Sequence, residues 1–296
     1  MSATVLILGP SGKIGSHAAS AFRNGGWQVR DYRRGTDMTA AARGCDVIVN
    51  GLNPPNYHDW ARQIPAITDQ VLAAARTSGA TVILPGNVYV YSDPGGTWSE
   101  TTPHAPVSRK GRIRMEMEQA YRDSGVPTIN LRAGTLFDPE RNGDVMSLVL
   151  LRNIAKGRVT TMGDPDVDQA YCYLPDWAEA ARQLADRRDS LARYEDIPFP
   201  GHTFTVTQLK SALEAELGRP LGIERFPWRA MALAAPFWEL AREMREMRYL
   251  YNMPHRLDGA KLHRLLPGFT DTDLRDALRA VIGPVHQKAR STHTSR

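Results

Sequence analysis

The sequence has few cysteines and no long apolar segment. Cys45 and Cys172 are its two cysteines, and their separation matches neither a disulfide framework nor a metal-ligand pattern. We therefore predict free buried thiols and a reducing, cytoplasmic location. No apolar leader opens the sequence, and no apolar run has the roughly 20 residues that a membrane-spanning helix needs. A membrane protein is not expected.

Charge of one sign is not concentrated anywhere except at the polar end of the chain. The formal net charge is +5, and the arginines are spread along the sequence. Such a balance is compatible with an anionic cofactor or substrate, but it does not predict nucleic-acid binding. Histidines such as His255 and His263 have no ligand-like spacing with cysteines or carboxylates, so no metal is predicted.

The most informative segment of the sequence is its first fifteen residues. Residues 4–8 are a short apolar run without polar alternation, which is typical of a strand buried on both faces of a parallel sheet. Three glycines follow with the spacing G-x-x-G-x-x-G, before a predicted helix over residues 16–23. This order favours a pyrophosphate-binding turn, although an ordinary turn has the same appearance. The predicted cofactor-binding residues are Gly9, Ser11, Gly12, Lys13, Ile14 and Gly15.

Strands and helices alternate through the first half. Strands are predicted over residues 27–32, 46–50, 81–84 and 127–131, with helices over 57–78 and 112–123. This alternation predicts an α/β fold, a Rossmann-type doubly wound parallel sheet. The second half is mostly helical, with helices predicted over 144–156, 208–217, 226–251 and 271–282, the third interrupted at Pro236. We predict a dinucleotide-binding domain over residues 1–160 and a smaller substrate-covering lobe over 161–296, partly interleaved with the sheet domain.

The end of the second strand predicts which dinucleotide is bound. An acidic residue there accepts a hydrogen bond from the ribose 2′-hydroxyl, whereas arginine accommodates a 2′-phosphate. That position is held by Arg33, followed by Arg34, which predicts NADP rather than NAD. Asp31 lies two residues earlier, and a shift of register by two would reverse the preference.

Five stretches together resemble a known family. They are residues 9–15, 46–51, 82–91, 131–139 and 173–178. In this order they are similar to the extended short-chain dehydrogenase/reductase superfamily, in its NAD-dependent epimerase/dehydratase group. The resemblance implies a small-molecule substrate and places Asn50 and Gly51 on the nicotinamide side and Asp37 near the adenine ring. It also implies that homodimerisation is possible.

The family's catalytic residues are replaced in this sequence. The family uses a Ser or Thr together with Tyr-x-x-x-Lys, and the resemblance places Asn87 at the Ser or Thr position. With Glu118 as the helix glutamate, Lys110 and Arg114 occupy the Tyr and Lys positions. With Glu116 as the anchor, the pair becomes Ser108 and Arg112. Neither alignment restores the tyrosine.

Three hypotheses follow from the missing tyrosine. Lys110 could be the acid–base group, Tyr89 or Tyr91 could approach the substrate from another side, or hydride chemistry could be absent. The first two predict an NADP-dependent oxidoreductase or an epimerase/dehydratase-like enzyme, with Asn87 orienting a substrate oxygen. The third predicts a non-catalytic NADP-binding regulator or, less directly, an assembly subunit that keeps the cofactor as a stabiliser.

Overall fold

The computed structural model describes residues 2–92, 95–140 and 143–293, with side chains to residue 283. Its centre is a six-stranded sheet in which every pair of neighbouring strands is parallel. The strand order is β10-β6-β4-β3-β1-β2. The strands are β1 (Thr4–Leu8), β2 (Gln28–Asp31), β3 (Val47–Asn50), β4 (Thr81–Asn87), β6 (Thr128–Ala133) and β10 (Tyr194–Pro198). The predicted α/β class and Rossmann-type sheet are confirmed.

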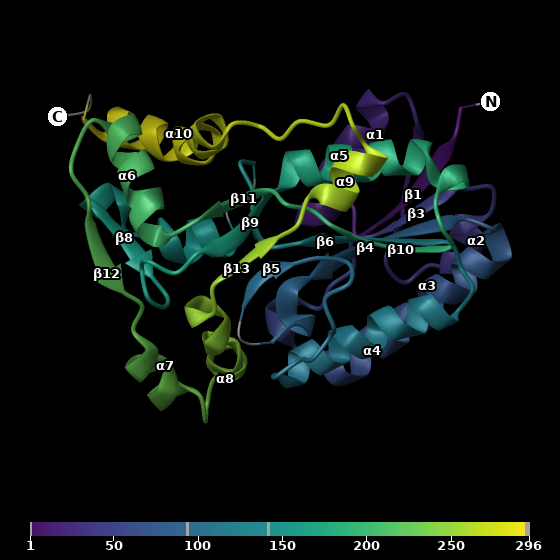
Figure 1. Ribbon diagram of the computed structural model, residues 1–296, viewed down its shortest axis with the longest axis horizontal. Coiled ribbons are helices and arrows are strands. Elements are labelled where there is room, and N and C mark those ends of the chain that lie inside the picture. The colour runs from purple at the N-terminus through teal and green to yellow at the C-terminus, as the bar shows by residue number, and fades with distance from the viewer. Residues whose placement is uncertain (1, 93–94, 141–142, 294–296) are drawn as a thin grey trace.

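Helices cover both faces of the sheet (Figure 1). Helices α1 (Lys13–Asn24) and α5 (Leu174–Asp186) pack on one face, and α3 (Trp60–Ser78) and α4 (Arg109–Asp123) pack on the other. The first strand supplies both cores, because Val5 and Ile7 point to one face while Leu6 and Leu8 point to the other. This explains the unbroken apolar run in the sequence.

The connection after β2 is short. The chain passes through α2 (Met38–Ala42), a helix of five residues, and returns to β3 on the opposite side of β1. The direction of winding therefore changes between β1 and β3. In open α/β sheets, ligands bind at the carboxyl ends of the strands that flank such a switch point.

The rest of the chain forms a lobe of short strands and helices beside the carboxyl edge of the sheet. Its small sheets pair β7 (Thr135–Phe137), β9 (Gln169–Tyr173) and β11 (His202–Phe204); β8 (Arg158–Thr161) and β12 (Gly222–Arg225); and β5 (Gly96–Trp98) and β13 (His255–Leu257). Its helices are α6 (Val206–Leu217), α7 (Trp228–Ala234), α8 (Glu239–Glu246), α9 (Ala260–Leu265) and α10 (Leu274–His293). Both α5 and β10 lie beyond residue 160 yet belong to the sheet layers, so the two predicted domains interleave in sequence.

One helical prediction is confirmed in its interruption and another is wrong. The helical segment predicted over residues 226–251 is divided at Pro236 into α7 and α8, as expected, because proline removes a backbone donor. The helix predicted over residues 144–156 is instead a π-helical turn, Met146–Leu150, and a 3₁₀ turn, Ile154–Lys156. Gly157, at φ 72°, ends the second turn. In the described part of the chain, no helix combines the length and hydrophobicity that a membrane span needs.

Candidate dinucleotide site and active site

The opening glycines form a tight cradle at the switch point. Gly9 has φ 73°, in the left-handed region, and its carbonyl accepts a hydrogen bond from the Gly12 amide at 2.9 Å. A Cβ at Gly15 would lie 2.1 Å from the Gly9 oxygen, and a Cβ at Gly51 would lie 2.7 Å from the Leu8 oxygen. Only glycine permits these backbone approaches, so the sequence spacing has a direct geometric reason.

The start of α1 is suited to an anion. Gly12 is its N-cap, no side chain caps the helix, and its first turn contains no acidic residue. The first amide groups are therefore available to a pyrophosphate. The Lys13 ammonium donates to the Gly143 carbonyl at 2.5 Å. Ser11 is exposed at the turn, whereas the Ile14 side chain joins the core beneath it.

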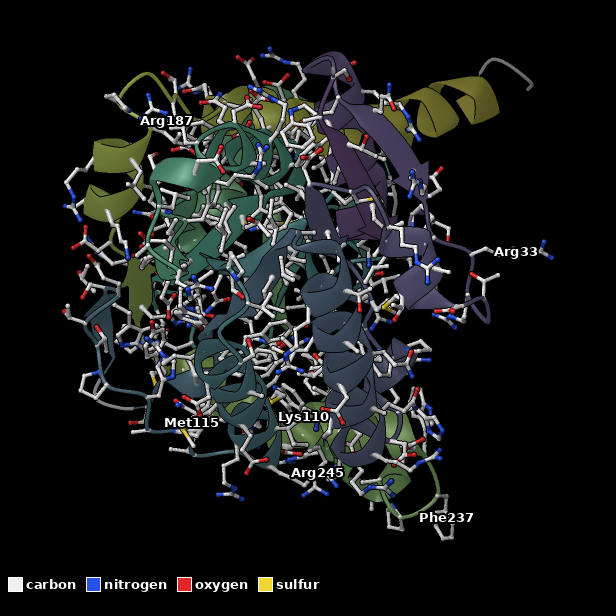
Figure 2. The ribbon with its side chains drawn as sticks, turned by 90° about the vertical axis from the view of Figure 1, so that its right-hand side faces the viewer. Arg33, Lys110, Met115, Arg187, Phe237 and Arg245 are labelled. Carbon is white, nitrogen blue, oxygen red and sulfur yellow. The ribbon has the colours of Figure 1, made fainter. Side chains whose placement is uncertain are left out.

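The residues after β2 lie at the edge of the sheet. Arg33 and Arg34 are exposed, and Figure 2 shows Arg33 extending outward from the ribbon. Asp31 is paired with Arg23 at 3.3 Å on the surface. The Asp37 carboxylate accepts from the Thr39 and Ala40 amides, so it caps α2.

At the end of β3, Asn50 turns toward the helix α4 rather than outward. Its Nδ2 donates to the Tyr121 hydroxyl at 3.2 Å, and its Oδ1 accepts from the Leu52 amide at 3.2 Å. Asn50 therefore shapes the loop that begins at Gly51. Its side chain holds that loop, so any contact with a cofactor would come from the backbone.

A buried ion cluster supports one of the two sequence alignments. Arg132 is fully buried, and its guanidinium donates to Glu118 at 2.7 Å and to Asp196 at 2.6 Å. Burial alone would lower the pKa of Arg132, but the two carboxylates raise it well above its usual value. Glu118 is buried in this cluster, whereas Glu116 is exposed; burial favours the Glu118 alignment, which stays a prediction. In the alternative alignment, Arg112 is exposed and Ser108 caps α4.

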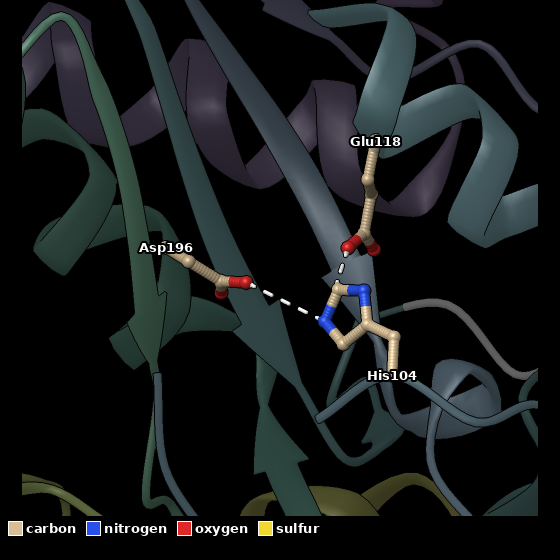
Figure 3. Close-up of side chains that lie close together, drawn as sticks. All are labelled: His104, Glu118 and Asp196. Atoms are coloured by element: carbon tan, nitrogen blue, oxygen red, sulfur yellow. Dashed lines mark ion pairs between the residues drawn. The ribbon is translucent and has the colours of Figure 1, made fainter. Parts of the chain in front are cut away.

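His104 completes this cluster (Figure 3). Its Nε2 lies 3.8 Å from Glu118 and 3.9 Å from Asp196. Three such groups can ligate a metal, but here the Arg132 guanidinium already donates to both carboxylates. Burial and the Arg132 charge lower the pKa of His104. The cluster is therefore an ion-paired support beneath the site.

Lys110 lies at the start of α4 with no exposed surface. Its ammonium donates to the Glu243 carboxylate and, at 2.7 Å, to Glu246, and both acceptors belong to α8. Its backbone amide also donates to Glu246 at 2.9 Å. Burial would raise the pKa of Glu243, but Lys110 and Arg109 hold it below its usual range. This geometry does not support Lys110 as the acid–base residue, because its donors are taken by carboxylates.

Asn87 and Tyr91 are positioned differently from one another. Asn87 ends β4, its Oδ1 accepts from the Tyr89 amide at 3.0 Å, and its carbonyl accepts from Arg132 at 2.6 Å. Within the described residues, no hydrogen bond involves its side-chain amide nitrogen. Tyr91 is buried against Trp98, and its hydroxyl donates to the Ser99 carbonyl at 3.3 Å. The Tyr91 phenol is thus buried and its proton is already donated, so this geometry does not support a catalytic role.

Two tyrosines meet beside Arg114. The Tyr57 and Tyr89 hydroxyl groups are 3.2 Å apart, and both side chains are partly exposed. Arg114 is buried, stacks over the Trp60 ring at 4.7 Å, and donates to Asn53 at 2.8 Å. Asn53 and Tyr57 belong to the loop that follows β3. Their meeting with α4 depends on tertiary packing, for which the sequence has no local signal.

Residues 5–198 match the NAD dependent epimerase/dehydratase family. The chain belongs to this family. The predicted resemblance is therefore confirmed, and the matched range covers the sheet, the glycine cradle and the Arg132 cluster. Among curated proteins, none matches this sequence.

Solved structures of similar fold extend over the whole chain. A UDP-glucuronic acid 4-epimerase from Bacillus cereus, in complex with UDP-glucuronic acid and NAD, is 18% identical, covers 96% of this chain and 99% of its own, and has a TM-score of 0.75. MoeE5 in complex with UDP-glucose and NAD is 16% identical over 97% and 99% of the two chains, with a TM-score of 0.74. A GalE-like L-threonine dehydrogenase from Cupriavidus necator is 17% identical over 96% and 99%, with a TM-score of 0.72. At these identities the likeness establishes the fold.

An arginine-lined cavity lies largely outside residues 5–198, the range that matches the family. It has a volume of about 630 Å³ and is lined mainly by α7, α8 and the start of α4. Its charged lining residues are Arg109, Arg242, Glu243, Arg245, Glu246 and Arg248. Because Glu243 and Glu246 are occupied by Lys110, the cavity presents an excess of positive charge.

Proposed function

We propose that this protein is a nicotinamide-dinucleotide-dependent enzyme of the epimerase/dehydratase type, acting on a hydroxyl or carbonyl carbon of a small molecule. The observation that carries the proposal is the glycine cradle at the switch point between β1 and β3. Gly9, Gly15 and Gly51 admit no Cβ there, and the first turn of α1 is uncapped and free of acidic residues. These features fit a pyrophosphate.

We assign different residues to the pyrophosphate, the nicotinamide ribose and the substrate oxygen. The amides of the Gly9–Gly15 turn would hold the pyrophosphate, and Arg114, at the family's lysine position, would bind the nicotinamide ribose. A bound nicotinamide supplies hydride transfer. Asn87 would donate a hydrogen bond to the substrate oxygen, because its Oδ1 already accepts from the Tyr89 amide.

Two observations favour different cofactors, one NAD and the other NADP. Solved relatives whose names state a cofactor contain NAD, so the comparisons do not support the NADP preference that Arg33 and Arg34 predict. We propose NAD as the cofactor. The exposed arginines remain available to a 2′-phosphate, so paired titrations with NADH and NADPH decide the question.

The substrate class that best fits is a nucleotide sugar. Relatives of the same fold are named with UDP-glucose, UDP-glucuronic acid or an NDP-hexosamine. The arginine-lined cavity offers charge of the sign that a diphosphate needs. One structure of similar fold, the GalE-like L-threonine dehydrogenase, is named for a substrate that is not a nucleotide sugar, so the fold alone does not set the substrate.

One observation favours a second function. Lys110 replaces the family's tyrosine and is held by two carboxylates of α8. A protein that binds the dinucleotide without turning it over would have this arrangement, and α8 would then be the element that reports binding to a partner. A cytoplasmic location and a homodimer stay predictions from the sequence.

Turnover distinguishes the two functions. Purified protein is incubated with NAD, or with NADP, and a panel of UDP-, dTDP- and GDP-sugars, and absorbance at 340 nm and sugar products are followed. The enzyme proposal expects a changed sugar or reduced cofactor with at least one substrate. Tight dinucleotide binding without either change would instead support the regulator.

A further inference from the structure

The missing tyrosine leaves the family's proton donor unassigned. At its place, Lys110 is fully buried and donates to Glu243 and Glu246. Four residues further along the same face of α4, Arg114 retains the positive charge of the family's lysine. A substitute donor must therefore be a hydroxyl close to Arg114 that a ligand can reach.

Tyr57 meets both conditions. Its side chain is partly exposed, unlike that of Tyr91. Its ring lies beneath Lys110, 5.0 Å from the ammonium, and its hydroxyl is 3.2 Å from that of Tyr89. Tyr89 is two residues beyond Asn87, the residue at the family's Ser or Thr position. The Tyr57 hydroxyl thus reaches the catalytic edge of the sheet from the loop after β3.

The backbone that delivers Tyr57 is strained. Asn56, Tyr57 and Asp59 have φ of 55°, 61° and 47°, and they are the described non-glycine residues with positive φ. Such conformations cost free energy in L-residues and persist only where the surroundings impose them. Here Pro54 and Pro55 precede the segment, and the Tyr57 ring is fixed against Trp60 at 5.1 Å. The strained backbone thus fixes the direction of the Tyr57 side chain.

The electrostatic surroundings suit a proton donor. Burial raises the pKa of Tyr57 to about 12, so the phenol is protonated at neutral pH. The hydrogen bond from Tyr89 and the charge of Arg114 act in the opposite direction and favour the phenolate. The same two groups would stabilise the anion that remains once the proton has been given away.

We propose that Tyr57 is the acid–base residue of this enzyme, in place of the tyrosine that α4 lacks. This inference rests on the proposed function. In the reducing direction, a carbonyl carbon of the substrate accepts a hydride from the reduced nicotinamide while its oxygen takes the phenolic proton of Tyr57, so C=O becomes CH–OH. Tyr57 becomes a phenolate that accepts a hydrogen bond from Tyr89, and water restores its proton. Oxidation runs the same transfers backwards.

The test compares Tyr57→Phe with Tyr249→Phe, a nearby phenol whose hydroxyl lies 3.5 Å from Ser108. The substrate is the nucleotide sugar that wild type turns over most rapidly. Tyr57→Phe is expected to lower kcat by about 100-fold or more, with KM little changed and the tyrosine limb of the pH profile lost. Tyr249→Phe is expected to retain the wild-type rate. A Tyr57→Phe variant with an undiminished rate would overturn the proposal.

A second measurement needs no substrate. Tyrosinate absorbance at 295 nm is titrated with and without NAD⁺. Because a positive nicotinamide beside Tyr57 favours its phenolate, NAD⁺ is expected to lower the pKa of one phenol in wild type and in Tyr249→Phe, but of none in Tyr57→Phe. A shift that persists in Tyr57→Phe, or that is absent in wild type, would overturn the placement of Tyr57. The expected shift without turnover of any sugar would retain that placement and refute the enzyme function.

Discussion

Two buried cations in this protein have similar surroundings and different origins. Arg132 and Lys110 are both fully buried, and each is held by two carboxylates. The partners of Arg132 come from α4 and β10, within the family's matched range. Those of Lys110 come from α8, outside it. The comparison teaches that one buried cation is held entirely within the residues that match the family, whereas the other joins those residues to a helix beyond the match.

Breaking the Arg132 cluster is expected to have the largest effect on stability. Arg132→Met would leave Glu118 and Asp196 buried without a cation, which costs about 3–5 kcal/mol. Urea denaturation measures this loss in the free energy of unfolding. The exposed Arg112 provides the control, since Arg112→Met should change stability by less than about 0.5 kcal/mol. A loss of the same small size for Arg132→Met would contradict the account.

Breaking the Lys110 cluster is expected to cost less. In Lys110→Met, Glu243 stays buried, but the Glu246 side chain is 23% exposed and can regain water. We expect a loss of about 2 kcal/mol. The double variant Lys110→Met/Glu243→Gln should recover part of it, which a double-mutant cycle measures. Additive losses would show that the two side chains are not coupled.

Lowering the pH is expected to weaken the ion pair between Lys110 and Glu243. The pKa of Glu243 is lowered in the folded protein, so its contribution to stability is full above its ordinary pKa of 4.5 and is lost as the pH falls below that value. The protection factors of α8 amides, which correct for the slower intrinsic exchange in acid, should therefore fall below about pH 4.5. Lys110→Met should abolish this fall as a distinct step. An α8 whose protection is flat across this range would contradict the coupling.

The arginines after β2 are expected to give the smallest effect. In Arg33→Ala/Arg34→Ala, NADPH should bind up to about 10-fold more weakly if the guanidinium groups contact the 2′-phosphate, since both are exposed and screened by solvent. NADH affinity should stay the same. Nucleotide fluorescence titrations measure both constants. A wild-type protein that binds NADH more tightly than NADPH would agree with the NAD contained in solved structures of similar fold.

The sequence predicted five of the six strands of the sheet but not β10, and four of the five, β1, β3, β4 and β6, are largely buried, whereas β2 is an exposed edge strand. Residues 4–8 and 46–50 have no polar alternation, and the glycine spacing has a steric reason within a few residues. The helix predicted over residues 144–156 failed because its periodicity is satisfied by two short turns. Local pattern does not distinguish these from one helix.

The candidate site was predicted in part. The resemblance over residues 82–91 placed Asn87, and the distance from Glu118 placed Lys110 and Arg114. No local signal separates Glu118 from Glu116, and the contact of Glu118 with Arg132 is visible only in the structure. The partners of Lys110 lie 133 and 136 residues away. The meeting of Tyr57 with Tyr89 spans 32 residues. Such contacts are set by the packing of the elements, which no local motif records.

Dinucleotide binding by Gly12→Asp tests the central claim most directly. An aspartate at the N-cap suits the helix, since Gly12 has φ −83° and ψ 168°. Its Cβ would lie 3.3 Å from the Gly9 oxygen, so the fold should be retained. The carboxylate, however, would repel a pyrophosphate. Calorimetric titration with NAD should show binding weakened by about 100-fold or more, or about 2.7 kcal/mol, with the Tm within a few degrees of wild type. A folded Gly12→Asp protein that binds NAD as tightly as wild type would contradict the account.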